Sequence, residues 1–177
     1  MEREKERNIR NREVFYFVLG IVLALLAVFG LGRVLHTNVP LAAVTSGSMT
    51  PAIKEGDLLV ISGVNPNTLK IGNIIVYCST DPALKDCLIV HRIVYITRVN
   101  GQIVGFVTKG DNNYVTDNQA GLEPPSGIPP QDVVGKVIFV IPLVGFLVIF
   151  LKQPAGFAFV VFLAILYFVI EIRRRDF

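Results

Sequence analysis

The chain has 177 residues, of which 52% are hydrophobic, and its formal net charge at pH 7 is +3. Its mean hydropathy of +0.56 is too high for an ordinary soluble domain and indicates a membrane protein with a modest polar part. The basic excess lies in the tails, because residues 36–136 hold seven Lys or Arg against eight Asp or Glu, so neither charge nor motif supports nucleic-acid binding.

The first predicted element is a transmembrane helix over residues 14–35, preceded by a cytoplasmic tail over residues 1–13. Val14 to Leu31 is a run of 18 residues without a charge. As a helix this run would be about 27 Å long, close to the hydrocarbon thickness of a bilayer. It exceeds the ~7–15 apolar residues of a cleaved signal peptide, so we predict an uncleaved anchor.

Residues 36–136 are predicted to form one mainly β domain outside the cytoplasm. The pair Asn100-Gly101 lies between two strand-like runs and is typical of a two-residue type I′ hairpin turn. About 100 residues are enough for one hydrophobic core and too few for two. The β-branched runs that predict strands, each bounded by turn residues, are 57–62, 73–79, 88–99, 102–109 and 132–140.

The two cysteines of the chain, Cys78 and Cys87, lie nine positions apart in this domain. Outside the cytoplasm a disulfide between them would close a short loop and stabilise the fold by about 2–3 kcal/mol in the chain-entropy model. We predict this disulfide, with two unpaired thiols as the alternative. A metal site is not expected, because no second pair of soft ligands is nearby in the sequence.

The C-terminal part of the chain is apolar but interrupted. We predict an interfacial apolar segment over 137–151, a second transmembrane helix over 152–172 and a basic cytoplasmic tail over 173–177. The charge-free run 155–170 has 16 residues, about 24 Å as a helix, which suits a thin or locally adjusted bilayer. Basic residues beside both outer apolar segments favour a cytoplasmic location for both ends and therefore two crossings. The alternative is one N-terminal span followed by a hairpin on the membrane surface.

Two serines in the stretch SGSM, Ser46 and Ser48, follow the first apolar run and are candidates for a nucleophile. A hydroxyl becomes a useful nucleophile when a base takes its proton and other groups stabilise the oxyanion that forms. The chain has two histidines. His36 lies just beyond the first apolar run and is expected to be solvated, whereas His91 lies within a predicted strand and is the candidate base. A lone histidine within a strand is more often a structural residue than a catalytic one. Whether His91 is catalytic therefore depends on the polar residues near it.

Two carboxylates, Asp111 and Asp117, lie six positions apart in the stretch KGDNNYVTDNQ. Either could accept a hydrogen bond from the second imidazole nitrogen of His91, fix its tautomer and stabilise the imidazolium. The alternative is an Asx-rich turn in which the aspartates only hold the backbone. The residues alone leave open which aspartate would contact His91 and which of these roles applies.

Three sequence blocks in this order resemble the type I signal peptidases, and within them the archaeal and endoplasmic-reticulum branch. The blocks are SGSMTPAIKEGD at 46–57, IVHR at 89–92, and TKGDNN with a further aspartate at 108–117. With the N-terminal anchor and the polar domain, the resemblance covers roughly residues 14–136. It implies the signal-peptidase-like β fold for the catalytic domain.

The resemblance also implies a role for each candidate residue. Ser48 would be the nucleophile, and His91 the general base, where the bacterial branch uses a lysine. Asp117 would be the essential acidic residue, with Asp111 in an accessory role. The glycine between the two serines allows a turn that aims the Ser46 hydroxyl and the Ser48 backbone N–H at one point, which predicts an oxyanion hole.

The implied function is that of a membrane-bound serine endopeptidase that cuts signal peptides from secreted preproteins after small residues at the membrane surface. Its partners would be signal-peptide-bearing preproteins, the lipid bilayer and the secretion translocon, with no cofactor, no metal and no nucleic acid. The expected location is the cell membrane, with the catalytic domain outside the cytoplasm and both termini inside. The alternatives are a membrane-anchored β domain that binds a partner without catalysis, and a related serine protease with a narrow set of clients.

Overall fold

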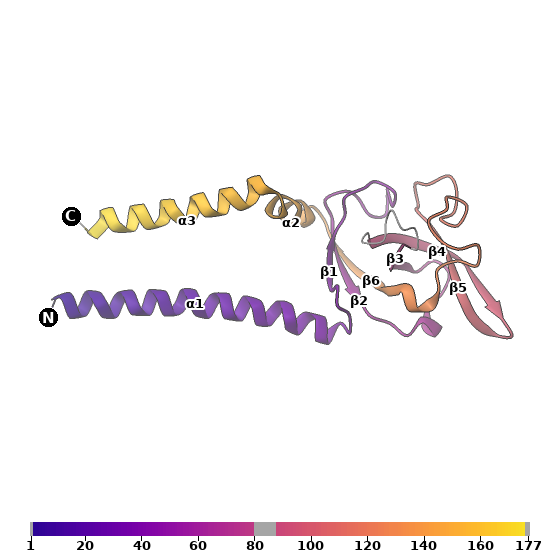
Figure 1. The fold of residues 1–177 in the computed structure, drawn as a ribbon, viewed down its shortest axis with the longest axis horizontal. Coiled ribbons are helices and arrows are strands. Elements are labelled where there is room, and N and C mark those ends of the chain that lie inside the picture. The colour runs from indigo at the N-terminus through magenta and orange to yellow at the C-terminus, as the bar shows by residue number, and fades with distance from the viewer. Residues whose placement is uncertain (1, 80–87, 176–177) are drawn as a thin grey trace.

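The computed structural model describes residues 2–79 and 88–175. The described residues form a six-stranded sheet with the strand order β1-β2-β6-β3-β4-β5, in which every neighbouring pair is antiparallel (Figure 1). The predicted mainly β domain is confirmed. The strands are β1 Leu41–Ala43, β2 Leu58–Ser62, β3 Ile74–Cys78, β4 Leu88–Val99, β5 Gln102–Lys109 and β6 Val133–Ile141.

The five predicted β-branched runs each form one strand of this sheet. The turn between β4 and β5 has positive φ at both central residues, 51° at Asn100 and 81° at Gly101, as a type I′ turn requires. Strand β1 was not predicted, because three residues are too few to show an alternating pattern.

The predicted apolar segment 137–151 is not one element. Strand β6 continues to Ile141 in the interior of the sheet, where it pairs with β2 on one side and β3 on the other. Backbone pairing with β2 carries this strand to Ile141, five residues past the predicted end of the β domain at residue 136 and one past the predicted strand run 132–140. The domain bounds themselves remain a prediction. Helix α2, Val144–Lys152, follows after a short turn, and its location at the membrane interface remains a prediction.

Both faces of the sheet are covered, so that β3 is buried on each side. Ile75 and Tyr77 contribute to one apolar cluster and Val76 to the other, as the alternation of a strand dictates. The second cluster also contains Met49 and Ile53, which come from the loop that follows β1. Burying a side chain such as Met49 stabilises the fold by about 1.5–3 kcal/mol, so this loop is held against the sheet by its own apolar residues.

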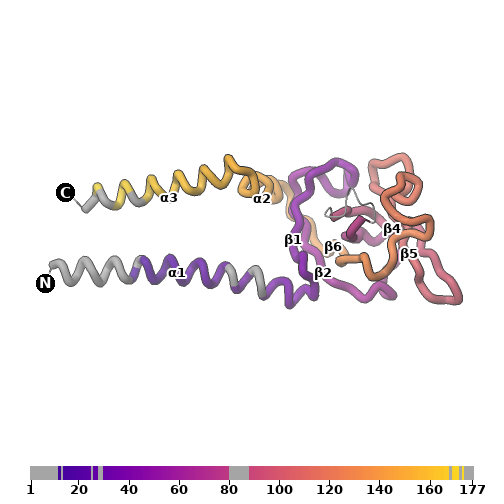
Figure 2. Tube along the Cα trace, viewed as in Figure 1, coloured from indigo at the N-terminus to yellow at the C-terminus, as the bar shows by residue number. Residues whose placement is uncertain are grey.

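Two long helices, α1 Glu2–Val34 and α3 Pro154–Arg175, extend from the same side of the sheet domain and run away from it side by side (Figures 1 and 2). Among the described residues, Pro154–Glu171 is long and apolar enough to cross a membrane, with a mean hydropathy of 2.2 over 18 residues. Val14–Ala24 is a shorter apolar stretch of α1. Membrane crossing by the predicted spans 14–35 and 152–172 remains a prediction.

Cys78 is the last residue of β3 and is exposed. Its predicted disulfide partner, Cys87, lies outside the described residues. The disulfide between them therefore remains a prediction.

Candidate active site

The serine loop between β1 and β2 is held in place by its apolar residues. Met49 is 2% exposed and anchors the loop in the core directly after Ser48. Two backbone hydrogen bonds then close a compact turn, from Thr50 N–H to the Gly47 carbonyl at 3.1 Å and from Ile53 N–H to the Met49 carbonyl at 3.0 Å. The loop therefore holds the half-buried Ser48 beside a buried neighbour.

Ser48, His91 and Asp117 form a continuous chain of hydrogen bonds. The Ser48 Oγ lies 3.0 Å from His91 Nε2, and His91 Nδ1 lies 2.6 Å from Asp117 Oδ2. His91 is 5% exposed and Asp117 is fully buried. An ionised Asp117 can only accept, so His91 Nδ1–H donates to it and Nε2 is left to accept the Ser48 hydroxyl proton. This is the arrangement in which an imidazole can activate a serine.

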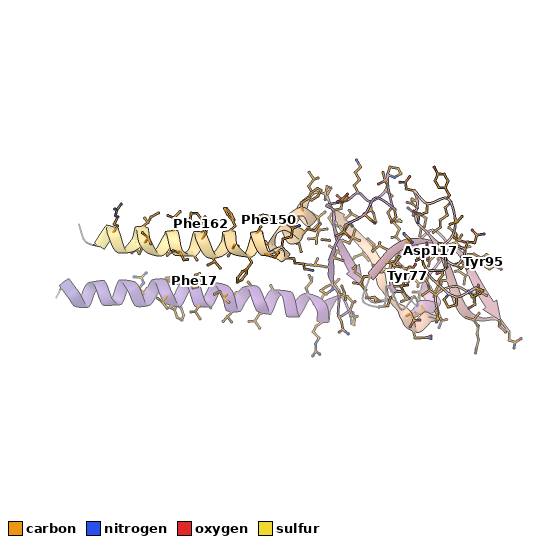
Figure 3. The ribbon with its side chains drawn as sticks, turned by 45° about the horizontal axis from the view of Figure 1, so that its top comes forward. Phe17, Tyr77, Tyr95, Asp117, Phe150 and Phe162 are labelled. Carbon is orange, nitrogen blue, oxygen red and sulfur yellow. The ribbon has the colours of Figure 1, made fainter. Side chains whose placement is uncertain are left out.

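Asp117 is stabilised as a carboxylate by three donors on the same oxygen. Besides His91, Tyr77 (labelled with Asp117 in Figure 3) donates its hydroxyl to Oδ2 at 2.9 Å. The Thr108 hydroxyl donates to the same oxygen at 2.5 Å. Burial by itself raises the pKa of the Asp117 carboxyl, but the hydrogen bonds from His91, Thr108 and Tyr77 outweigh burial, and the pKa lies below its ordinary value. The carboxylate is therefore ionised at neutral pH, as the orientation of His91 requires.

Among the described hydrogen bonds, Asp111 pairs with Arg92 and not with His91. Its carboxylate accepts two hydrogen bonds from Arg92, from Nε at 2.8 Å and from Nη2 at 2.6 Å, and Arg92 Nη1 also donates to the Gly72 carbonyl. The hydrogen bonds from Arg92 lower the pKa of the Asp111 carboxyl. Of the two candidates, Asp117 is thus the aspartate on His91, and Asp111 fixes the start of its loop to β4.

The loop that begins with Gly110 also supports the serine loop from behind. Asn112 N–H donates to the Ser48 carbonyl at 2.8 Å, and Asn112 Nδ2 donates to the Gly47 carbonyl at 3.3 Å. A Cβ at position 110 would lie 2.7 Å from the Ser48 carbonyl oxygen, so a side chain there would push the two loops apart. The Gly-Asp-Asn stretch therefore positions Ser48 through its backbone.

Ser46 lies close to the candidate nucleophile. Its Oγ is 3.4 Å from Ser48 Oγ, and the residue is exposed. Both serines line an open cavity of about 330 Å³. The remaining lining residues are mostly aliphatic and come from both sides of the site: Ala43, Val44, Thr45, Met49, Ile53, Leu88, Ile89, Val90, His91, Asn113 and Leu122.

Sequence reasoning missed three buried residues beside the site. Tyr77 and Thr108 lie within predicted strands, where their spacing does not distinguish them from ordinary core positions. Glu123 is 5% exposed, although it lies in a loop rich in Gly and Pro, where an acidic residue is expected to be solvated. Burial, and then the charge of Asp117, raise the pKa of Glu123 to about 7, against hydrogen bonds from the backbone of Thr108 and Asn118.

The second histidine, His36, is exposed at the end of α1, as expected. Its backbone carbonyl packs against Gly63, where an added Cβ would lie 1.9 Å from the His36 oxygen. Within residues 2–79 and 88–175, no group of three or more His, Cys, Asp or Glu could hold a metal ion.

The chain was compared with known proteins. It is 31% identical over 157 residues to the signal peptidase complex catalytic subunit SEC11C of Canis lupus familiaris, covering 86% of this chain and 80% of that protein. It is 33% identical over 144 residues to the catalytic subunit SEC11 of Fusarium vanettenii, covering 80% of each chain. For the SEC11 of Verticillium alfalfae the identity is 37% over 127 residues, or 70% of each chain. No family model matches the sequence.

Proposed function

Because the chain belongs to the family of the signal peptidase complex catalytic subunits SEC11, we propose that it is a membrane-bound serine endopeptidase that removes signal peptides from preproteins. The observation that carries this proposal is the hydrogen-bonded chain Ser48–His91–Asp117 at an open cavity. A binding domain without catalysis has no need of an imidazole held between a serine and a buried carboxylate.

The proposed mechanism is acyl transfer through Ser48. Its Oγ attacks the peptide carbonyl carbon while His91 Nε2 takes the hydroxyl proton, and Asp117 stabilises the imidazolium that forms. His91 then returns the proton to the leaving amine as the C–N bond breaks. Water, activated in turn by His91, attacks the acyl-enzyme ester, restores the Ser48 hydroxyl and releases the signal peptide with a new carboxyl end.

We assign the protein to the branch that uses histidine and aspartate in place of lysine. Beside His91 the chain has Arg92, which stays charged and cannot act as a base. The side chain of Arg92 is also engaged with Asp111 and Gly72. His91 is therefore the base available to Ser48 in the described site.

The oxyanion hole is assigned to the Ser46 hydroxyl and the Ser48 backbone N–H. The two serine oxygens lie 3.4 Å apart, so a carbonyl carbon attacked by Ser48 would carry its oxygen within reach of Ser46. Such preorganised donors are worth about 3–4 kcal/mol each in comparable hydrolases. Because Ser46 is exposed, its hydroxyl can turn from Ser48 Oγ toward the substrate.

The cavity beside Ser48 favours an extended substrate with small side chains. It lies between residues 43–46, which continue from the edge strand β1, and residues 88–91 of β4. An extended peptide can add backbone hydrogen bonds to such an edge, while shallow aliphatic pockets accept alternate side chains. This supports cleavage after small residues.

We place the β domain at the membrane surface through α2. This helix exposes Phe146, Leu147, Phe150 and Leu151, and it lies beside the start of α3 (Figure 3). It is joined to the serine loop, because Asp57 Oδ1 accepts a hydrogen bond from Leu143 N–H at 3.3 Å. An α2 immersed in the interface would hold the active site where membrane-anchored cleavage sites are concentrated.

The proposed topology has α1 and α3 crossing the bilayer with both chain ends in the cytoplasm. The two helices leave the sheet domain on the same side, which matches two crossings in opposite directions (Figure 1). The basic tails at both ends support the same orientation. The proposed partners are the preprotein, the bilayer and the secretion translocon that delivers the preprotein.

A panel of preproteins tests the proposed function. The liposome-embedded protein is expected to cut unrelated preproteins at the signal-peptide junction, and a bulky residue placed directly before the scissile bond should abolish cleavage because the cavity is small. Cleavage products are identified by mass spectrometry. If only one client is cut, the narrow-client alternative holds, and if bulky and small residues are cut equally the proposed site is wrong.

The pair Arg92–Asp111 provides a second test, of loop positioning. Asp111→Asn is expected to lower kcat about tenfold, because loss of the bidentate pair loosens the loop that supports Ser48. The unfolding free energy should fall by less than about 1 kcal/mol, because the pair is partly solvated. Urea unfolding measures the change in stability, and cleavage kinetics measure the change in kcat. The control is Glu55→Gln, which also replaces a carboxylate by an amide but at an exposed position outside the pair. Unchanged kcat would contradict the positioning role.

A further inference from the structure

A second buried carboxyl group is connected to the Ser48–His91–Asp117 chain through one side chain. Glu123 Oε1 accepts a hydrogen bond from the backbone N–H of Thr108 at 3.3 Å, and Glu123 Oε2 lies 3.4 Å from Thr108 Oγ1. The same Thr108 hydroxyl contacts Asp117 Oδ2 at 2.5 Å. Thr108 and Asp117 are fully buried and Glu123 is 5% exposed, so this linkage is shielded from solvent.

The number of protons available for these hydrogen bonds indicates the protonation state of Glu123. A threonine hydroxyl has one proton to donate, and its shortest contact, with Asp117, takes it. Ionised Asp117 has no proton to share. The contact between Thr108 Oγ1 and Glu123 Oε2 is therefore a hydrogen bond only when Glu123 carries a proton and donates it to Thr108.

The surroundings of Glu123 support the neutral form. The titratable groups that face it are Asp117 in the same loop and Tyr77 on β3, and Thr108 faces it from β5. No salt bridge among the described residues includes Glu123. Burial without a cation disfavours a carboxylate, and the neighbouring charge of Asp117 does so further.

We propose that Glu123, as a neutral carboxylic acid, is a positioning residue that fixes the Thr108 hydroxyl on Asp117 and so orients His91. This inference rests on the proposed function, since it extends the same site by two residues. Glu123 does not touch the substrate and acts only through Thr108. When Glu123 ionises as the pH rises, two carboxylates compete for one hydroxyl proton, and the orientation of Asp117 loosens.

Cleavage kinetics across pH test this role with two variants. Glu123→Gln keeps a donor for Thr108 at every pH, so its kcat should match wild type at about pH 6 and lack the decline that wild type shows as Glu123 ionises at about pH 7. Glu123→Leu removes the donor and should lower kcat about tenfold to a hundredfold with little change in KM. The exposed Glu55→Gln should retain the wild-type profile.

A spectroscopic measurement keeps the inference separate from the proposed function. The ¹⁵N shifts of labelled His91, recorded in a His36→Gln background, report its tautomer without any substrate. Wherever the His91 imidazole is neutral, wild type on the acid side of the Glu123 ionisation and Glu123→Gln on both sides of it should show a fixed Nδ1–H tautomer, and Glu123→Leu a mixture of both. If no variant cuts a preprotein but the tautomers differ in this way, the proposed function fails and the positioning role holds. Identical tautomers and identical pH profiles in all variants would overturn the positioning role.

Discussion

Replacing Ser48 by alanine is expected to lower kcat for preprotein cleavage by about a millionfold, the loss that removal of the nucleophile causes in a comparable serine hydrolase. The reason is chemical: His91 Nε2 would face a methyl group in place of a hydroxyl 3.0 Å away. Substrate binding should change little, because Ser48 is one of 13 residues that line the cavity and alanine removes only its hydroxyl. Single-turnover cleavage by the liposome-embedded variant measures the loss.

The control for this substitution is Ser126→Ala, which removes an exposed hydroxyl in the loop before β6. It should leave both kcat and KM at wild-type values. Circular dichroism and the melting temperature should be the same for Ser48→Ala and wild type, because Ser48 is only half-buried. A Ser48→Ala protein that is folded and cuts at the wild-type rate would refute the assignment of the nucleophile.

Replacing Asp117 by asparagine is expected to lower kcat about ten-thousandfold, as it does for the corresponding carboxylate in a serine protease triad. The asparagine would keep the shape of the side chain but could donate to His91 Nδ1 and so favour the wrong tautomer. The Nε2 atom would then carry a proton and could no longer accept one from Ser48. Cleavage rates and the ¹⁵N shifts of His91 check the two parts of this explanation.

The same substitution should alter the pH dependence of stability. The pKa of Asp117 is lowered in the fold, so its contribution to the unfolding free energy is present at neutral pH and is lost as the pH falls through the folded-state pKa. Asp117→Asn should therefore be less stable than wild type at neutral pH, with a smaller further loss in acid. Asp132→Asn, in the turn before β6, is the control. Equal unfolding free energies for Asp117→Asn and wild type at pH 7 would contradict the stabilising network around Oδ2.

How much of the fold could be predicted differs between its elements. Strands β2 to β6 follow from β-branched runs bounded by turn residues, and the hairpin at Asn100-Gly101 follows from its turn chemistry. The run 132–140 also predicts β6, but residues 137–141 are as apolar as a membrane segment, so the sequence equally allowed an apolar segment that begins at residue 137. Only their pairing with β2 makes them part of the sheet.

The sequence by itself determined which groups were available: a serine after a glycine, a histidine on a strand and two aspartates in one polar loop. It could not determine which aspartate meets His91, because the distance between side chains on different strands is set by sheet register and loop path. The tertiary structure places Asp117 on His91 and pairs Asp111 with Arg92. It also brings Glu123 and Thr108 together in the interior, where burial makes neighbouring protein groups the hydrogen-bond partners of both side chains.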